Sequence, residues 1–211
     1  MREPSDEEDL RKVREFLGGD SQAFEFLFEK YRDRVYRIAY RFVRNKDDAL
    51  DVAQDVFLRV YTGIKGFKTD SKFFTWLYRI STNRAIDFTR QKRSRAALGV
   101  ETPLLEAEGR PLPGRSSVRD PADLAEEKEL DEKLARAVDG LSEKHRAVFT
   151  LHATENLSYR EIAEVLGCSI GTVMSRLFYA RKKIQETLRR AGLERPGRGA
   201  APGRSPEVSH E

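Results

Sequence analysis

The stretch that decides the fold is LSYREIAEVLGCSIGTVMSRLFYARKKI, residues 157–184, whose pattern predicts two short helices joined by a tight turn. Ser158 precedes the first helix and Glu161 follows three residues later, which is the spacing of a capping box. Gly167 is expected to end that helix, because glycine adopts the left-handed conformation without steric cost. Ser169 is expected to cap the second helix. The pattern predicts a helix-turn-helix over 159–178 that inserts into the major groove of DNA.

The second helix of this motif is amphipathic. Its apolar residues recur at helical spacing and are expected to face inward: Ile170, Val173, Leu177, Ala180 and Ile184. Small residues that permit close approach to DNA and cations that bind phosphate are expected on the outward face: Thr172, Ser175, Arg176, Tyr179, Lys182 and Lys183. The contacts predicted for duplex DNA come from Ser169, Thr172, Ser175, Arg176, Tyr179, Arg181 and Lys182. The alternative is a surface helical hairpin of a larger helical protein.

Composition narrows the class of protein. Charged residues make up 35% of the 211 residues, and no apolar run approaches the length that spans a membrane. The first residues, MREPSDEEDL, are acidic and lack the apolar core of a signal peptide. A single cysteine excludes an internal disulfide framework. We therefore expect a cytoplasmic protein without direct membrane insertion.

The periodic pattern predicts an all-α fold with two small helical domains joined by a flexible linker. Residues 1–19 form an acidic N-terminal segment with a short helix, and 20–92 form the first helical domain. Residues 93–122 are rich in proline and glycine and are expected to be the linker. Residues 123–191 form the second domain, which contains the helix-turn-helix, and 192–211 are expected to be a disordered tail.

The second helix of the first domain, which begins near Asp47, has two different faces. Its apolar residues are expected to pack inward: Ala53, Val56, Phe57 and Val60. The opposite face is acidic, with one apolar member: Asp47, Asp51, Gln54, Asp55 and Leu58. Acid near a helix N-terminus is favoured by the helix dipole, which is sufficient to explain Asp47 and Asp48. For Asp51, Gln54 and Asp55 the pattern favours a protein partner over a solvated face.

The third long helix, FFTWLYRISTNRAIDF at 73–88, carries aromatic residues on more than one face. Its core residues are expected to be Phe73, Trp76, Leu77 and Ile80. The rings of Phe67, Phe74 and Tyr78 are interleaved with cations, which is typical of a platform for single-stranded nucleic acid; these cations are Lys68, Lys72, Arg79, Arg84, Arg90, Lys92 and Arg93. Asn83 is suited either to a base edge or to water on an exposed helix face.

Four segments in this order resemble the extracytoplasmic-function (ECF) group of bacterial sigma factors, the smallest members of the sigma-70 family. They are GDSQAFEFLFEKY, DALDVAQDVFLRVY, FFTWLYRISTNRAIDF and residues 157–184. The resemblance covers about 20–190, apart from the linker. It implies that the chain directs core RNA polymerase to promoters in transcription initiation, as in a stress response. It also implies that the second helix docks on a coiled coil of the largest polymerase subunit, through Asp48, Asp51, Gln54, Asp55 and Leu58.

The resemblance also assigns two contacts with promoter DNA. A pocket for a flipped base of the minus-ten element would be shaped by Phe67, Lys68, Asp70 and Ser71, and further contacts would come from Trp76, Arg79, Asn83 and Arg84. The helix-turn-helix would read the minus-thirty-five element, and an anti-sigma factor would be a further partner. Many relatives carry basic residues where this chain has Met174 and Tyr179, so fewer guanine contacts are available. The upstream sequence that is read therefore stays open.

The sequence offers no sign of catalysis. His145, His152 and His210 lack metal-ligand spacing, and there is no glycine-rich phosphate loop or nucleophile–base arrangement. We expect no catalytic residue, metal, cofactor or small-molecule substrate. A free-standing regulator of duplex DNA would explain the helix-turn-helix but not the acidic face. A single-strand-binding module would explain the aromatic platform alone.

Overall fold

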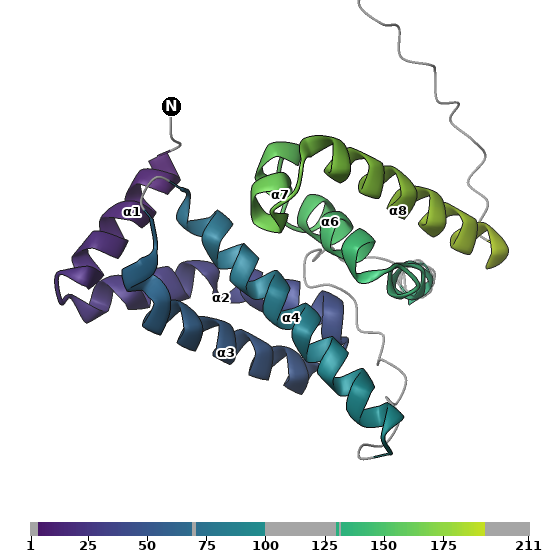
Figure 1. Cartoon of the computed structure of the whole chain (residues 1–211), viewed down its shortest axis with the longest axis horizontal. Coiled ribbons are helices and arrows are strands. Elements are labelled where there is room, and N and C mark those ends of the chain that lie inside the picture. Colours follow the sequence, from purple (N-terminus) through teal and green to yellow (C-terminus); the bar gives the residue numbers. More distant parts are fainter. Residues whose placement is uncertain (1–3, 69–70, 100–129, 131, 193–211) are drawn as a thin grey trace, which may run out of the picture.

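The computed structural model describes residues 4–68, 71–99, 130 and 132–192, and in this part of the chain the regular elements are helical (Figure 1). The expected all-α fold is thus confirmed. The helices with defined bounds are α1 (Pro4–Leu17), α2 (Ser21–Val43), α3 (Lys46–Gly63), the 3-10 turn η1 (Ile64–Gly66), α4 (Phe73–Ala97), α6 (Glu143–Ala153), α7 (Tyr159–Leu166) and α8 (Ile170–Arg190). A further helical stretch covers 132–139.

In the first half of the molecule α2, α3 and α4 pack around one apolar core. The Asp20 side chain caps α2 by accepting a hydrogen bond from the Gln22 amide at 2.9 Å. Asn45 caps α3 by accepting from the Asp48 amide at 3.0 Å. The sequence placed the start of this helix near Asp47, but α3 begins at Lys46, because the side chain of Asn45, two residues before Asp47, satisfies the free Asp48 amide.

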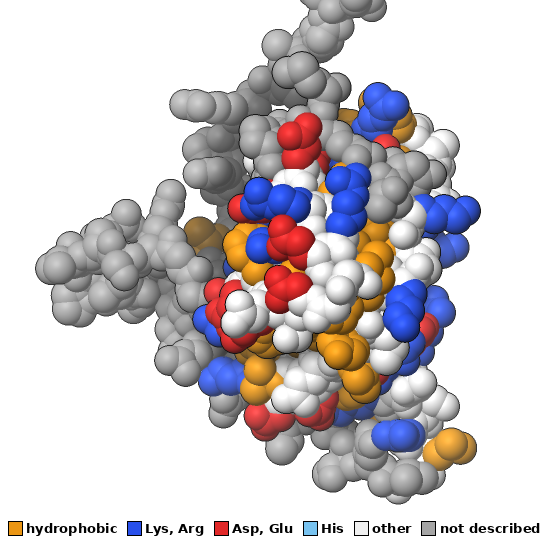
Figure 2. Space-filling model, turned by 90° about the vertical axis from the view of Figure 1, so that its left-hand side faces the viewer, with side chains coloured by type: hydrophobic (Ala, Val, Ile, Leu, Met, Phe, Trp, Pro, Cys, Tyr) orange, Lys and Arg blue, Asp and Glu red, His pale blue; other side chains and the backbone are white. Residues whose placement is uncertain are grey.

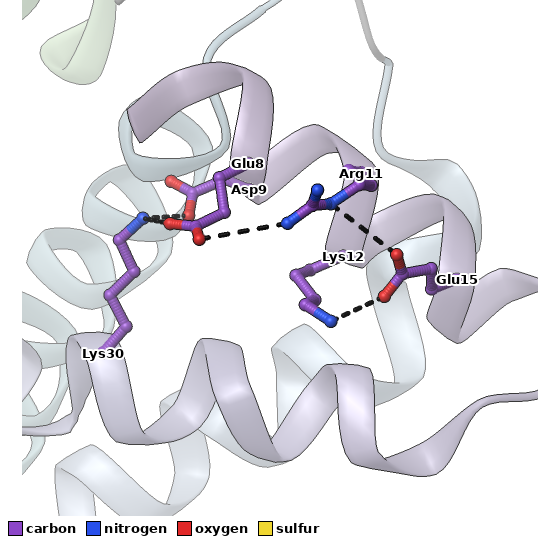
Figure 3. Close-up of polar contacts among 6 residues, drawn as sticks. All are labelled: Glu8, Asp9, Arg11, Lys12, Glu15 and Lys30. Atoms are coloured by element: carbon purple, nitrogen blue, oxygen red, sulfur yellow. Dashed lines mark hydrogen bonds and ion pairs between the residues drawn. The ribbon is translucent and has the colours of Figure 1, made fainter. Parts of the chain in front are cut away.

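The N-terminal helix α1 belongs to this domain, because it packs against α2 and α4. Leu10 and Val13 are buried in the core, and the Asp9 carboxylate is buried as well. Asp9 accepts a hydrogen bond from the Lys30 ammonium at 2.6 Å (Figure 3). It accepts a second hydrogen bond from the Tyr31 hydroxyl. Burial raises the pKa of Asp9 despite these hydrogen bonds. Over the α1 end of the molecule, acidic and basic side chains alternate with hydrophobic ones (Figure 2).

The helix-turn-helix has the expected local geometry. Ser158 and Glu161 form the capping box, and Gly167 ends α7 with a φ of 60°. Ser169 caps α8 by accepting from the Thr172 amide at 3.1 Å. The two helices meet at a bend of 102°. No single described helix is long and apolar enough to cross a membrane, and α7 and α8 meet that test only when they are taken together across their bend.

The two halves of the molecule are in direct contact. Helix α7 lies against α4, and α6 lies against α2 (Figure 1). One apolar cluster continues from the first half into the second. Helix α4 extends to Ala97, so the first residues of the expected linker are helical. The rest of that linker up to residue 129, and the expected tail beyond 192, lie outside the described residues.

Three helices meet at the ammonium of Lys72, the residue that precedes α4. Its Nζ lies 3.2 Å from the Asp6 carboxylate of α1 and 3.0 Å from the Glu161 carboxylate of α7. The side chain of Asp6 is only 5% exposed. Among the described residues its Oδ2 accepts no hydrogen bond, and the ion pair with Lys72 is the contact that compensates its charge. Lys72 therefore compensates a buried charge on α1 and joins the two halves.

Replacing Lys72 with methionine tests this junction. The Lys72→Met variant keeps most of the side-chain volume but leaves Asp6 without its cation, so we expect the free energy of unfolding to fall by about 1–3 kcal/mol. Urea unfolding at neutral pH measures the change. Lys65→Met, at an exposed lysine of η1, is the control and should be close to the parent protein. Equal unfolding midpoints for the two variants would contradict the role of Lys72.

Candidate functional site

The acidic face of α3 is exposed as the sequence predicts. Asp51 and Gln54 point to solvent. Large apolar side chains lie among them, with Leu58 63% exposed and Leu50 and Tyr61 each 51% exposed. Acidic and apolar groups on one face suit a protein partner better than a polyanion, because carboxylates repel phosphates.

Two carboxylates assigned to the same face are engaged within the fold. The Asp48 carboxylate accepts a hydrogen bond from the Lys92 ammonium at 2.5 Å. The Asp55 carboxylate accepts hydrogen bonds from Arg84 and, at 3.2 Å, from Arg59. Burial alone would raise the pKa of Asp55, but the two arginines outweigh it and the pKa lies below its ordinary value. Asp48 and Asp55 therefore join α3 to α4, and Arg84 is occupied by this contact.

Lys68 and Ser71, which precede α4, are joined by backbone and side-chain hydrogen bonds. The Ser71 amide and hydroxyl donate to the Lys68 carbonyl at 3.2 and 3.1 Å. Lys68 is exposed, whereas the Phe67 ring is buried, with its centroid 5.2 Å from that of Trp76 and 5.8 Å from that of Phe73. Asp70 lies outside the described residues.

The sequence predicted a platform of three aromatic rings open to single-stranded nucleic acid, and this prediction is wrong for two of the rings. Phe67 is buried, and Tyr78 is buried as well. The Tyr78 ring packs edge-on against Tyr31. Its hydroxyl donates a hydrogen bond of 3.4 Å to the carboxylate of Glu155, which lies in the segment between α6 and α7. Burial raises the pKa of Tyr78. The half-buried rings of Phe74 and Trp76 remain at the surface of this region.

Several cations of α4 contact the second half of the molecule. The Arg79 guanidinium donates to the Glu164 carbonyl of α7, and Arg90 lies 2.8 Å from the Glu143 carboxylate of α6. Asn83 is exposed on the same helix. Helical spacing places Trp76, Arg79 and Asn83 along one side of α4, with Lys68 and Ser71 before its start, but Arg79 is engaged by the helix-turn-helix domain.

The predicted residues of α8 take different positions. Ser169 and Thr172 form the cap of the helix, and the exposed Ser175 hydroxyl donates to the Thr172 carbonyl at 3.1 Å. Arg176 is half-buried, with its Nη1 3.9 Å from the Cys168 sulfur. Arg181 is exposed on the last turns.

The predicted core of α8 is wrong for one residue, Ile170. The expected core residues Val173, Leu177, Ala180 and Ile184 are buried, but Ile170 is 46% exposed. The reason is its position at the first residue of α8, where it aligns at four-residue spacing with Met174 and Phe178 at the edge of the buried stripe.

Tyr179 and Lys182 line a hollow of about 380 Å³ between α8 and the start of α6. Its other lining residues are Gly140, Leu141, Ser142, His145, Lys183 and Glu186. No local sequence pattern predicts this hollow, because it arises where helices distant in the chain pack together. Among the described residues no group of three His, Cys, Asp or Glu side chains is placed to hold a metal ion; His210 lies outside them.

A comparison of two acids on α3 separates a structural role from a surface role. Asp55→Asn removes the charge that binds Arg84 and Arg59, so we expect a loss of about 1 kcal/mol in the free energy of unfolding. Asp51→Asn alters an exposed group and should change it by less than about 0.5 kcal/mol. Chemical denaturation of both variants measures the difference. Equal losses would mean that Asp55 does not hold α4.

The carboxylate of Glu161 predicts a pH dependence. Burial raises its pKa, but hydrogen bonds from Ser158 and Lys72 outweigh burial and lower it. The ionised group therefore stabilises the fold above its unfolded pKa of about 4.3, and this stabilisation is lost as the pH falls through the lower folded pKa. Glu161→Gln retains the cap but not the charge. Its free energy of unfolding should be lower than that of the parent by about 0.5–1 kcal/mol near neutral pH.

This difference should shrink toward about pH 3, where the parent also loses the charge. Unfolding curves at the two pH values check it. The control is Glu164→Gln, at a more exposed acid of α7, whose side chain is 49% exposed. A difference for Glu161→Gln that is the same at both pH values would contradict an electrostatic origin.

Comparisons with known proteins agree with the two halves of the structure. The family model of sigma-70 region 2 matches residues 27–95, and that of sigma-70 region 4 matches residues 131–184. The ECF RNA polymerase sigma factor SigW of Bacillus subtilis is 34% identical and covers 85% of this chain and 96% of its own length. The ECF RNA polymerase sigma-E factor of Escherichia coli K12 is also 34% identical, covering 82% of this chain and 92% of its own.

Solved structures show the same fold. CnrH in complex with the cytosolic domain of CnrY superposes with a TM-score of 0.64 at 25% identity, and covers 87% of this chain and 98% of that one. The sigma factor RpoE of Bartonella quintana, solved with the anti-sigma factor NepR, gives a TM-score of 0.60 at 21% identity, with coverage of 79% and 96%. With sigma-70 regions 2 and 4 in order on one helical chain, this protein belongs to the ECF group of RNA polymerase sigma factors.

Proposed function

We propose that this sigma factor docks on core RNA polymerase through α3 and directs the enzyme to promoters that carry two DNA elements. The observation that carries the proposal is the exposed acidic and apolar face of α3, at Asp51, Gln54 and Leu58. A free-standing DNA-binding protein has no use for such a face, whereas a polymerase coiled coil with basic and apolar groups would cover it. Asp48 and Asp55 support this surface from below by fixing α3 on α4.

The downstream contact is proposed at the turn before α4 and along the exposed side of that helix. Lys68 and Asn83 are exposed there, and Trp76 offers a partly exposed ring for stacking on the non-template strand of the minus-ten element. The hydrogen bond from the Ser71 hydroxyl to the Lys68 carbonyl holds these two residues together, and they would form one edge of the pocket for a flipped base. Arg79 becomes available to a phosphate once its hydrogen bond to the Glu164 carbonyl is broken.

The upstream contact is proposed for the helix-turn-helix. The start of α8 would enter the major groove of the minus-thirty-five element, and the exposed cations Arg181 and Lys182 would bind phosphates at its edge. We assign no catalytic step, metal or cofactor to this chain, and we place its action in the cytoplasm with polymerase and promoter DNA. A regulatory protein partner is also proposed, because the similar CnrH binds the cytosolic domain of CnrY.

A gel-shift series with purified protein, core RNA polymerase and a promoter library tests the proposal. We expect specific retention of DNA only when core polymerase is present. The double variant Asp51→Lys, Leu58→Glu should bind core polymerase about tenfold more weakly or worse. Asp51→Lys reverses a charge on the α3 face, and Leu58→Glu places a charge in an apolar contact. The matched control is Asp33→Lys, at an acid of α2 that is 80% exposed and lies outside the α3 face.

The two arms have separate outcomes. If the protein alone holds a duplex site tightly and core polymerase adds nothing, the chain is a free-standing regulator. If the double variant binds core as the Asp33→Lys control does, the polymerase surface lies elsewhere than α3.

A further inference from the structure

One exposed side of the first turns of α8, next to the buried stripe, is apolar. Ile170 is 46% exposed, Met174 54% and Phe178 63%. Four-residue spacing places these side chains in a row along one side of the helix. The buried stripe of Val173 and Leu177 lies beside this row, so the three exposed side chains contribute little to the core. We call Ile170, Met174 and Phe178 the apolar row.

The position of the apolar row indicates what covers it. It begins directly after Ser169, the cap of the second helix of the helix-turn-helix, and this end of such a helix enters the major groove. It remains exposed although α7 packs against α4, so closure of the two halves does not cover it. The exposed cations Arg181, Lys182 and Lys183 follow on the same helix and match a flanking phosphate backbone in charge.

Gly171, beside this row, points to close approach by a partner. A Cβ built at this residue would meet only the Ser169 hydroxyl oxygen, at 3.9 Å, which is an ordinary contact. The residue is exposed and has no left-handed φ, so the fold does not require glycine there. Glycine in a helix is less favourable than alanine, and a bare backbone at this place is explained by a surface that comes very near to it.

The chemistry of the row selects one feature of the major groove. Guanine is read there by bidentate arginine or lysine, but residues 169–178 contain one arginine, Arg176, which is half-buried beside Cys168. Apolar side chains make no hydrogen bonds to base edges. The apolar group that bases present in the major groove is the C5-methyl of thymine.

We propose, resting on the proposed function, that the apolar row reads thymine methyl groups in the upstream promoter element. Met174 occupies the centre of the row and contacts the methyl groups most directly, with Ile170 and Phe178 on either side. Gly171 permits the base edges to approach the helix. Specificity at this element then comes from the shape of the DNA and from burial of thymine methyl groups against the apolar row. The cations farther along α8 bind phosphates without selecting bases.

The test uses DNA that differs only in the methyl group. Duplexes carry a fixed minus-ten element and a randomised upstream segment, synthesised with either thymine or deoxyuridine at the randomised positions. Deoxyuridine pairs as thymine does but lacks the C5-methyl. Each methyl buried against the row changes affinity by about fourfold, so with two buried methyls holoenzyme formed with core polymerase should retain the thymine pool more than about tenfold more tightly than the deoxyuridine pool.

Variants of the holoenzyme locate the effect. Met174→Ala should lower retention of the thymine pool and leave the deoxyuridine pool nearly unchanged. Gly171→Ala should weaken binding to the thymine pool without lowering the melting temperature of the protein. The control Lys183→Ala removes an exposed cation and should weaken both pools by the same factor.

Equal retention of the two pools by the parent holoenzyme would overturn the proposal and leave the sigma factor assignment intact, provided that retention still requires core. Loss of retention for both pools would overturn the proposed function together with this inference. If Met174→Ala weakens binding to core polymerase or another protein and thymine gives no advantage, the apolar row is a protein contact and methyl recognition is wrong.

Discussion

The ammonium of Lys72 ties helices of both halves together at one point, beside the apolar cluster that the halves share. Lys72 precedes α4, the helix proposed to take single-stranded DNA. Its ammonium neutralises Asp6 on α1 and binds Glu161 on α7. Glu161 has two tasks, because the same carboxylate completes the capping box of the helix-turn-helix by accepting from the Ser158 amide. A change at Lys72 therefore acts on the packing of α1, on the start of α7 and on the contact between the sigma region 2 and region 4 halves.

Closure of the two halves has opposite consequences for the two candidate DNA surfaces. The region 2 surface is partly engaged, since Arg79 donates to the Glu164 carbonyl and Tyr78 is covered by the segment that carries Glu155. The outward face of α8 is turned away from this contact, and Met174 and Phe178 remain exposed. One guanidinium donor of Arg79 is held by the Glu164 carbonyl while the two halves are in contact, whereas the exposed side chains of α8 take no part in that contact.

The sequence predicted features that are local and missed those that depend on packing. The capping box at Ser158, the helix end at Gly167 and the cap at Ser169 follow from residues within one or two turns, and each is confirmed. The burial of Tyr78 depends on a loop 77 residues away, and the occupation of Asp55 on an arginine 29 residues away. Periodicity could show that α3 has an acidic face, but it could not separate the exposed Asp51 from the engaged Asp55.

Exposed apolar side chains on α8 are informative because the fold gains little from them. Phe178 and Met174 expose more than half of their surface, and Gly171 gives up helix stability where alanine would fit. Three unfavourable choices on one side of a single helix are explained by a partner that covers that side. In the proposed function the major groove covers this side of α8, and the apolar group that base edges present there is the thymine methyl. The scarcity of outward arginines on the first turns of α8 and the presence of the apolar row are thus the two observations on which the proposed methyl recognition rests.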